Sequence, residues 1–524
     1  MSSQTGQVWW NQGQADIKWN ALVSGLLLFL LCTFLLVRGQ SADNSEQDQV
    51  TKMERHNEAV AYIAKAINSF HELKIPFRIY HGSTNSTRII SLDPNKVIDI
   101  RHLSHIIHVD TARQTVVVEP NVPMDRLVEV TLKYGLVPLV VPEFPGITVG
   151  GSYSGTAGES SSFKHGFFDR SVTWCEIVLA NGATVKASAS ENPDLFYGAV
   201  GACGTLGVTT LFEIQLAQAS RYVELTYRPV TSISEAISLI KKCAKEDHEY
   251  LDGIIYSLTH GIIVTGKLVD IPSSRHHRIQ RFTRAHDPWF YMHAQKFKAT
   301  SLTELVPLTD YLFRYDRAAF WMGAHSFSLF WMPCNRFTRW LLDPLMHTRK
   351  MYEALHHSGH AQRFIIQDLA LPAETVEEFI EYIDRDFGIY PLWLCPMRAD
   401  SEAPLHTWPR ATGLLINVGV WGPGRGYGDS DFDTFVEDNR AIERKVRELG
   451  GLKWLYAHTY YTEEEFWKIY DRKAYELLRE KFHARTLPSL FEKVKAADAY
   501  RPTNELTGVL KAMLGRDHLL AKRK

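Results

Sequence analysis

Apolar positions recur at helical spacing in some segments of this chain and form short strand-like runs in others. This pattern predicts a protein of mixed α and β structure. After residue 51 the apolar residues recur at helical spacing, which predicts a helix with one buried face: Val60, Ile63, Ile67 and Phe70. Short apolar runs with polar borders follow, and IPFRIY, VIDI and TVVVEP are therefore expected to be strands. A second helix is expected from Met124 to Gly135, because glycine is a good residue for a helix end.

The next segment predicts a hairpin followed by a long strand. CEIVLANGATVKAS carries Asn181-Gly182 between two apolar runs, which is the signature of a type I′ turn. GACGTLGVTTLFEIQL reads as a glycine turn that leads into a strand.

The middle of the chain repeats one order of elements. RYVELTYRPV, a helix around SISEAISLIKKCAK, YLDGIIYSL and GIIVTGKLVD read as β-α-β-β. RFIIQDLAL, a helix over TVEEFIEYIDRDFG, YPLWLCPM and GLLINVGVW repeat that order about 140 residues later. Two such units in one sheet would form a cap domain.

Three glycine-containing loops indicate a site where the main chain meets a ligand. They are residues 82–86, 150–162 and Gly201–Gly207. Glycine lets the main chain approach a ligand closely, and successive N–H groups form an anion-binding concavity, which would suit a diphosphate. The alternative is that these are ordinary surface turns. A Rossmann G-x-G-x-x-G opening a helix is absent, and GPGRGYG at Gly422–Gly428 reads as a plain loop.

An uncharged apolar run, Ala21–Val37, lies between Lys18 and Arg38. Its seventeen residues would span about 26 Å as a helix, near the lower limit for crossing a bilayer. Three tryptophans precede it and suit a membrane interface. A cleaved signal peptide is the alternative, but the preceding segment is long and no A-x-A site follows. We expect a retained single-span anchor.

Length, charge and cysteine spacing limit the possible functions. A chain of 524 residues is expected to form at least two domains. The formal net charge of -1 gives no general attraction for nucleic acid, so no nucleic-acid partner is expected. The six cysteines show neither a zinc-site spacing nor a disulfide framework, so we expect a reducing compartment and no metal.

Aromatic residues are concentrated in Asp287–Trp340, where they make up fourteen of fifty-four residues against 12% of the whole chain. The segment could line a pocket for a large apolar ligand or contact a membrane surface. An ordinary aromatic core is the alternative. The neighbouring SSRHHRIQRFTR is basic and reads as a solvated loop or a contact for lipid headgroups or phosphate.

The order VEPNVPMDRLVEVTLKYGL, VPEFPGITVGG, EIVLANG and NPDLFYGAVGACGTLGVTT resembles the FAD-binding domain of the vanillyl-alcohol-oxidase type. GTAGESSSFKHG, GIYPLWLCPM and LYAHTYYTEEEFWKIYD are most similar to the membrane-anchored Δ24-sterol reductases, and the resemblance covers roughly residues 50–495. It implies an α+β fold with non-covalent FAD, NADPH as donor, an endoplasmic-reticulum membrane setting, and saturation of the C24=C25 bond of a sterol side chain in sterol biosynthesis.

The resemblance also implies a division of the chain. We expect an N-terminal segment over 1–45 with a transmembrane helix at about 21–37, and an FAD-binding domain over 50–217. A cap or substrate domain would cover 218–455 and contain the aromatic insert 287–340. Residues 456–524 would pack back on the FAD-binding domain.

The resemblance assigns the FAD site position by position. The predicted cofactor-binding residues are Gly82, Ser83, Thr84, Asn85, Ser86, Thr148, Val149, Gly150, Gly151, Gly155, Thr156, Gly158, Glu159, Ser160, Ser161, Ser162, Gly204 and Gly207. Asn85 stands where covalent members of the superfamily commonly have a histidine, and His165 is a poor candidate, so bound flavin should be releasable. Two motifs depart from the reductases: HGSTNST replaces Arg-Pro-x-Trp, and G-T-A-G-E replaces G-T-G-x-E.

An alkene reductase of this class needs a hydride from flavin and a proton from the protein. Tyr456, Tyr460 and Tyr461 lie where the chain is expected to return to the flavin, and Arg317 lies in a motif similar to the reductases. We predict that this group contains the catalytic residues. Each tyrosine could instead be structural.

Two other functions remain open from the sequence. One is a flavin oxidase that passes electrons from an alcohol-type substrate to O₂, and the other is a non-catalytic flavin-fold membrane scaffold. The anchor and aromatic insert favour a sterol or similar apolar substrate. Asn85 belongs to the chain's only N-x-[ST] sequon, and a glycan there would obstruct the flavin loop. The catalytic domain is therefore expected to face the cytosol.

Overall fold

The long helix expected after residue 51 is present as α2 (Gln49–Glu72), which buries Val60, Ile63 and Ile67. The computed structural model describes residues 49–88, 90–271, 278–398, 403–405, 413–425, 431–457, 459–496, 505–514 and 519–520. The predicted membrane helix at 21–37 lies outside them. Among the described helices none is long and apolar enough to cross a membrane.

The first sheet is antiparallel and has the strand order β3-β4-β8-β6-β7, with β5 also paired to β8. Its strands are β3 (Ile106–Asp110), β4 (Thr115–Val118), β5 (Leu136–Pro138), β6 (Val172–Val178), β7 (Thr184–Ser188) and β8 (Val208–Gln218). The predicted hairpin is confirmed as β6 and β7 around Gly182, whose φ is +82°. The predicted type I′ turn is wrong, because Asn181 lacks the positive φ that this turn needs at both central residues. A short parallel pair, β1 (Arg78–Tyr80) and β2 (Val97–Asp99), accompanies this sheet.

The helices of the first half are α3 (Met124–Leu132), α4 (Val149–Ser154), α5 (Ser162–His165) and α6 (Pro193–Ala199), with a 3-10 turn η1 at Phe168–Ser171. The predicted helix from Met124 is thus confirmed. The segment 150–162, expected to be a loop, instead begins inside α4. Thr148 caps this helix by accepting a hydrogen bond from the Gly151 N–H at 3.2 Å.

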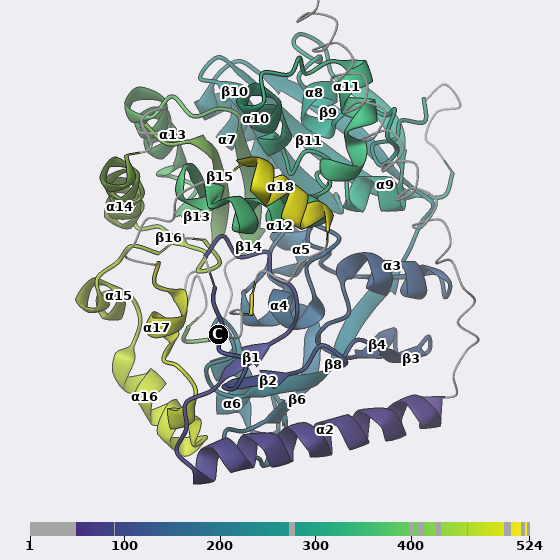
Figure 1. Ribbon diagram of the computed structural model, residues 1–524. Coiled ribbons are helices and arrows are strands. Elements are labelled where there is room, and N and C mark those ends of the chain that lie inside the picture. Colours follow the sequence, from purple (N-terminus) through teal and green to yellow (C-terminus); the bar gives the residue numbers. More distant parts are fainter. Residues whose placement is uncertain are drawn as a thin grey trace, which may run out of the picture. The chain divides into compact units, whose positions relative to one another are not determined.

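The second sheet is formed by the two predicted β-α-β-β units, so their order of elements is confirmed. The first unit is β9 (Tyr222–Val230), α7 (Ile233–Cys243), β10 (Tyr250–Ser257) and β11 (His260–Val269). The second is β13 (Phe364–Pro372), α13 (Val376–Asp386), β14 (Leu392–Arg398) and β15 (Leu414–Pro423). β10 and β14 join the units, β12 (Leu302–Pro307) lies at one edge, and β16 (Leu452–Lys453) lies at the other (Figure 1).

The two faces of the second sheet belong to different cores. The apolar stripes of α7 and α13 pack with Leu251 and Leu394 on one face. Trp393, Cys395 and Trp421 face the other way and join the core of the first sheet. The second face therefore points toward the segments in which the candidate site lies.

Most of the aromatic insert is ordinary core, which answers the question its composition raised. Its helices are α8 (Phe290–Ala294), α9 (Leu308–Leu312), α10 (Met322–Leu329) and α11 (Arg336–Leu341), followed by the 3-10 turn η2 (Asp343–Leu345) and α12 (Thr348–Ser358). Trp289 and Trp321 are each only 1% exposed. Around α11, in contrast, Trp331, Phe337 and Trp340 are exposed.

The remaining elements are η3 (His360–Gln362), α14 (Phe432–Glu448), α15 (Glu463–Ile469), α16 (Arg472–Lys481), η4 (Ala484–Thr486), α17 (Leu490–Val494) and α18 (Glu505–Met513). The Tyr475 hydroxyl donates to Thr205 Oγ1 at 2.8 Å, and Arg479 donates to the Thr205 carbonyl at 3.2 Å. The C-terminal helices thereby hold the turn at 201–207. The domain boundaries given above stay a prediction.

Candidate active site

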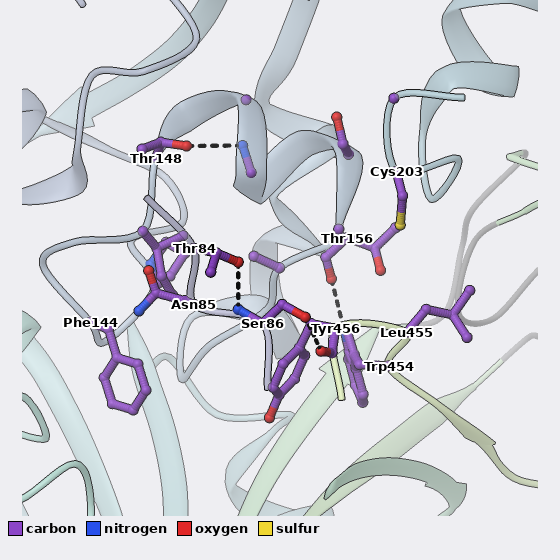
Figure 2. Close-up of a pocket in the computed structure, with 18 of the residues that line it drawn as sticks. Thr84, Asn85, Ser86, Phe144, Thr148, Thr156, Cys203, Trp454, Leu455 and Tyr456 are labelled. Atoms are coloured by element: carbon purple, nitrogen blue, oxygen red, sulfur yellow. Dashed lines mark hydrogen bonds between the residues drawn. The ribbon is translucent and has the colours of Figure 1, made fainter. Parts of the chain in front are cut away.

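A cavity of about 300 Å³ lies where several segments distant in the sequence meet (Figure 2). It is lined by parts of 79–88, 142–158 and 201–209, by the inward face of the second sheet, by Trp454–Tyr456 and by Lys493. Twelve predicted cofactor-binding residues line it: Ser83, Thr84, Asn85, Ser86, Thr148, Gly150, Gly151, Gly155, Thr156, Gly158, Gly204 and Gly207. The cavity thus brings together all three glycine-containing loops.

At Gly150 and Gly155 the loop containing α4 contributes bare backbone rather than free donors. The Gly150 N–H donates to the Pro120 carbonyl at 2.8 Å, and the Gly155 N–H donates to the Gly151 carbonyl at 2.9 Å. A Cβ on Gly150 would lie 2.8 Å from the Pro120 Cβ, and one on Gly155 would lie 2.9 Å from the Gly151 oxygen. These glycines therefore allow close approach, whereas the sequence suggested that their N–H groups donate to the ligand.

Six predicted cofactor-binding residues do not line the cavity: Gly82, Val149, Glu159, Ser160, Ser161 and Ser162. The Glu159 carboxylate instead accepts hydrogen bonds from the hydroxyls of Ser160, at 2.7 Å, and Ser161. The Ser162 Oγ accepts from the Glu159 N–H at 2.9 Å. This polar cluster holds the loop together, and the predicted cofactor-binding role of its serines stays a prediction.

The first loop is held by the segment that returns from the second sheet. Ser86 Oγ donates to the Tyr456 carbonyl at 2.7 Å, and the Trp454 indole donates to the Thr156 carbonyl at 2.8 Å (Figure 2). The N–H groups of Thr84 and Asn85 have no hydrogen-bond partner in the described part of the chain. Both residues line the cavity, so these donors are available to a ligand.

Positive charge collects at the end of the cavity near Cys203. Arg88 and Lys493 line it, and Arg78 lies close enough to act on both. None of these three cations forms an ion pair among the described residues. Burial, with the repulsion of the Arg78 and Arg88 guanidinium groups, lowers the pKa of Lys493 to about 8. A buried anion would offset this repulsion, and the donor set fits a diphosphate.

His81 belongs to the same end of the cavity. Burial, followed by the charge of Lys493, lowers the pKa of His81 to about 4, so its imidazole is neutral at physiological pH. His81 therefore adds a polar group to this end without adding a further charge.

Aromatic rings form the opposite part of the cavity, and Figure 2 shows Phe144 and Cys203 on opposite sides of the view. The Phe144 ring packs on Phe320 and Trp421, with centroids 5.6 and 5.8 Å apart. Trp393 packs on Phe320 at 5.0 Å. Phe144, Phe320, Trp393 and Trp421 all line the cavity, which gives this part an apolar wall.

A proton-bearing pair faces this apolar wall. The Tyr456 hydroxyl donates to Asp368 Oδ2 at 2.5 Å, and the Asn417 amide donates to Asp368 Oδ1 at 2.8 Å. All three residues line the cavity. Burial raises the pKa of Asp368, and burial with the Asp368 charge raises the pKa of Tyr456 well above its usual value. Tyr456 therefore holds its proton until a stronger base develops beside it.

Three other members of the predicted catalytic group, Arg317, Tyr460 and Tyr461, do not line the cavity. Arg317 is 2% exposed and donates to Asp343 and to the carbonyls of Phe282, Asp287 and Ala285. Its guanidinium thus joins the insert to the segments on either side of it, and its predicted catalytic role stays a prediction. Tyr460 is also absent from the cavity lining. Its backbone N–H donates to the Glu443 carboxylate at 3.0 Å.

Sequence reasoning missed the residues that reach the cavity from outside the glycine loops: His81, Arg88, Glu143, Asp368, Asn417 and Lys493. Asp368 and Asn417 interrupt two otherwise apolar strands, which was an available signal because a buried polar residue needs a partner. Lys493 gave no signal, because it lies in a short helix of mixed charge.

Comparison with known proteins bears on the first half of the chain. The FAD binding domain family matches residues 56–188. This range contains the first loop, Glu143 and the loop that includes α4. It ends before the turn at 201–207.

Relatives match over most of the chain. A human Delta(24)-sterol reductase is 32% identical over 412 residues, which cover 76% of this chain and 77% of that protein. The enzyme of the same name from Pisum sativum is 30% identical over 433 residues, covering 76% of each. A Delta(24)-sterol reductase homolog of Caenorhabditis elegans is 26% identical over 450 residues, covering 80% of this chain and 81% of the relative.

Proposed function

Since the chain belongs to the Delta(24)-sterol reductase family, we propose that it is an FAD-dependent reductase that saturates the C24=C25 bond of a sterol side chain with NADPH as donor. The observation that carries this proposal is the division of one cavity. At one end lie the cations Arg88 and Lys493, which form no ion pair among the described residues. At the other end Tyr456 and Asp368 face the apolar wall.

The residues present fit FAD. The diphosphate would be held by Arg88 and Lys493, and the glycines of α4 would allow its close approach, while the Thr84 and Asn85 N–H groups would offer further donors to the cofactor. Asn85, whose amide cannot form the covalent bond of a histidine, occupies the expected attachment position. We therefore propose that FAD is bound non-covalently.

When bound and reduced, FAD supplies a hydride to one alkene carbon. The other carbon then needs a proton, and the Tyr456 hydroxyl is the group that lines the cavity and holds one. Its transfer would leave a phenolate beside Asp368. Because burial raises the pKa of Asp368, this carboxyl can carry a proton to restore Tyr456.

The apolar wall favours a hydrocarbon side chain over an alcohol or polyol. Phe144, Phe320, Trp393 and Trp421 offer few hydrogen-bonding groups, and the Trp393 indole N–H already donates to Asp252 at 3.2 Å. Against these four rings a polyol would lose its hydration and gain few partners. This supports reduction of an apolar substrate over oxidation of an alcohol.

We also propose that the enzyme works at the endoplasmic-reticulum membrane, anchored by Ala21–Val37. A second contact is supported by Trp331, Phe337 and Trp340, which are 95%, 64% and 49% exposed on and beside α11. Large exposed aromatic side chains of this kind suit the boundary between headgroups and acyl chains. The domains 50–217 and 218–455 would then divide cofactor binding from substrate binding.

The decisive experiment is anaerobic stopped-flow absorbance with the full chain in detergent or vesicles. NADPH, NADH and a candidate alcohol are mixed separately with the oxidised protein, and bleaching of the flavin identifies the donor. The reduced protein is then mixed with a Δ24 sterol. Reoxidation with formation of the saturated side chain is expected. Bleaching by the alcohol and reoxidation by O₂ alone would instead establish an oxidase.

A further inference from the structure

Glu143 is a buried acid in the cavity wall with no assigned role. It lies between β5 and α4, is 7% exposed and lines the cavity. Its Oε1 has no hydrogen-bond partner, and the side chain forms no ion pair within the described ranges. Its neighbour Phe144 belongs to the apolar wall. Glu143 therefore stands where the reacting parts of the cofactor and substrate are proposed to meet.

The charges around Glu143 do not balance if every acid is ionised. Two other buried carboxyl groups, Glu159 and Asp252, act on it together with one guanidinium, Arg314. Arg314 donates to Asp252 at 2.7 Å, so its charge is already opposed. Three carboxylates and one cation would leave two uncompensated negative charges in a buried region. Burial, with the Glu159 charge, raises the pKa of Glu143 well above its usual value.

Asp252 and Glu159 differ from Glu143 because each accepts hydrogen bonds from neighbouring side chains. Asp252 also accepts from the Tyr315 hydroxyl at 2.8 Å, and Glu159 accepts from Ser160 at 2.7 Å. Both of those carboxyl groups thus accept hydrogen bonds from neighbouring side chains, those to Asp252 all at Oδ2, although Asp252 Oδ1 has no partner among the described residues. Glu143 alone of the three lines the cavity without such a partner, and as a neutral acid it carries an O–H donor.

We propose that Glu143 is a neutral carboxylic acid that donates a hydrogen bond to the ring of the bound flavin. The inference rests on the proposed function. An alkene has no lone pair that could accept the bond, whereas the flavin ring carries carbonyl oxygens and ring nitrogens. Glu143 is thus a positioning residue that also favours the reduced ring, because a donor stabilises the electron density gained on reduction. Its ionisation would remove the donor and add a repelling charge.

The test compares holoprotein of the wild type with Glu143→Gln and Glu143→Leu, and with Glu129→Gln as the exposed-acid control on α3. Each protein is reduced in equilibrium with a reference dye. Glu143→Leu is expected to lower the ratio of reduced to oxidised flavin about tenfold, which corresponds to the loss of one hydrogen bond. Glu143→Gln keeps an N–H donor, so its ratio of reduced to oxidised flavin should stay within a few-fold of the wild-type ratio. The wild-type ratio should fall at high pH as Glu143 ionises, and this fall should be absent in Glu143→Gln.

Infrared difference spectroscopy provides a second readout, which does not depend on the fold of Glu143→Leu. Reduction of the flavin should shift the C=O band of a protonated carboxyl group, and this band should be absent in Glu143→Gln. An unchanged ratio in Glu143→Leu, or no carboxyl band, overturns the inference while flavin binding and sterol reduction by the wild type stand. A chain that binds no flavin overturns the proposed function as well.

Discussion

At the scale of single residues, Tyr456 is the position where the proposed chemistry depends on one atom. Its hydroxyl lines the cavity and is held by Asp368. Tyr456→Phe removes only that oxygen, so flavin reduction by NADPH should stay near the wild-type rate. Sterol reduction should fall roughly 10²- to 10⁴-fold, the usual contribution of a positioned acid.

Single-turnover stopped-flow separates these two half-reactions. Tyr382→Phe, on the outer helix α13, serves as the matched control and should behave as wild type. A Tyr456→Phe enzyme with undiminished sterol reduction would show that the proton comes from another group, with water or Glu143 as the next candidates.

His56 carries a second prediction, about stability and pH. Its two ring nitrogens bond Glu119 at 2.8 Å and Glu176 at 3.1 Å. Burial opposes the charged imidazole, but the bonds and charges of the two carboxylates outweigh it and raise the pKa of His56 from 6.5 to about 9. The stabilisation is therefore complete below about pH 6.5 and is lost as the pH rises through about 9.

The measurement is urea unfolding of wild type and His56→Gln between pH 6 and 9.5. Glutamine does not titrate, so the difference in unfolding free energy should shrink with rising pH, by up to about 3 kcal/mol. Since His347 titrates in the same direction, only this difference isolates His56. A constant difference across the range would contradict the assignment.

At the scale of elements, α17 delivers a cation to the cavity from the C-terminal part of the chain. Lys493→Met keeps the length and apolar stem of the side chain but removes its charge. We expect flavin affinity to fall roughly 10-fold, in line with the loss of one charge-assisted hydrogen bond. Lys473→Met, on the exposed surface of α16, is the control.

The readout is flavin fluorescence titration of apoprotein at several salt concentrations. Wild-type affinity should depend more steeply on salt than that of Lys493→Met, because one contact with the anion is lost. Equal affinities in the two proteins would place the diphosphate elsewhere.

The element α4 carries a prediction about shape. Gly155→Val would put side-chain atoms against the Gly151 carbonyl, where even a Cβ would lie at 2.9 Å. Flavin binding should be lost while the far-ultraviolet circular dichroism spectrum stays close to wild type. Gly135→Ala is the comparison for backbone strain outside the cavity: a Cβ there would meet nothing within 4 Å, but the φ of +71° would be strained, so stability should fall while flavin binding remains. Full flavin content in Gly155→Val would assign the loop a different role.

The sequence predicted helices and strands correctly where the apolar residues follow a clear periodic pattern. Both β-α-β-β units, the hairpin at Asn181-Gly182 and the helix from Met124 are present. It did not predict α4, because glycine and serine disfavour helices and only the Thr148 cap and surrounding contacts stabilise this one. It could not pair Tyr456 with Asp368 or bring Lys493 to the cavity, since those contacts join segments whose separation no local pattern encodes.

At the scale of the whole molecule, the position of Asn85 predicts the topology. Asn85 lines the cavity and belongs to the chain's only N-x-[ST] sequon. A glycan attached there would occupy the flavin site, so we expect residues from Gln40 onward to face the cytosol, where NADPH is available.

Endoglycosidase treatment of the full chain expressed in cells tests this orientation. No mobility shift is expected, and Asn85→Gln should migrate like wild type. A new sequon placed before Ala21 should be glycosylated and acts as the positive control. A shift that disappears in Asn85→Gln would place the domain in the lumen and remove the first loop from the flavin site.

The hydrogen bond between Ser86 and Tyr456 joins positions 370 residues apart, and this separation delays completion of the cavity during synthesis of the chain. At roughly 5–20 residues per second, a ribosome needs on the order of 20–75 s to extend from one partner to the other. Throughout that interval the first loop has been made but lacks the segment that holds it. Flavin can therefore bind only late in the synthesis of each chain. A prematurely terminated chain would have no complete cavity, even if its first sheet had folded.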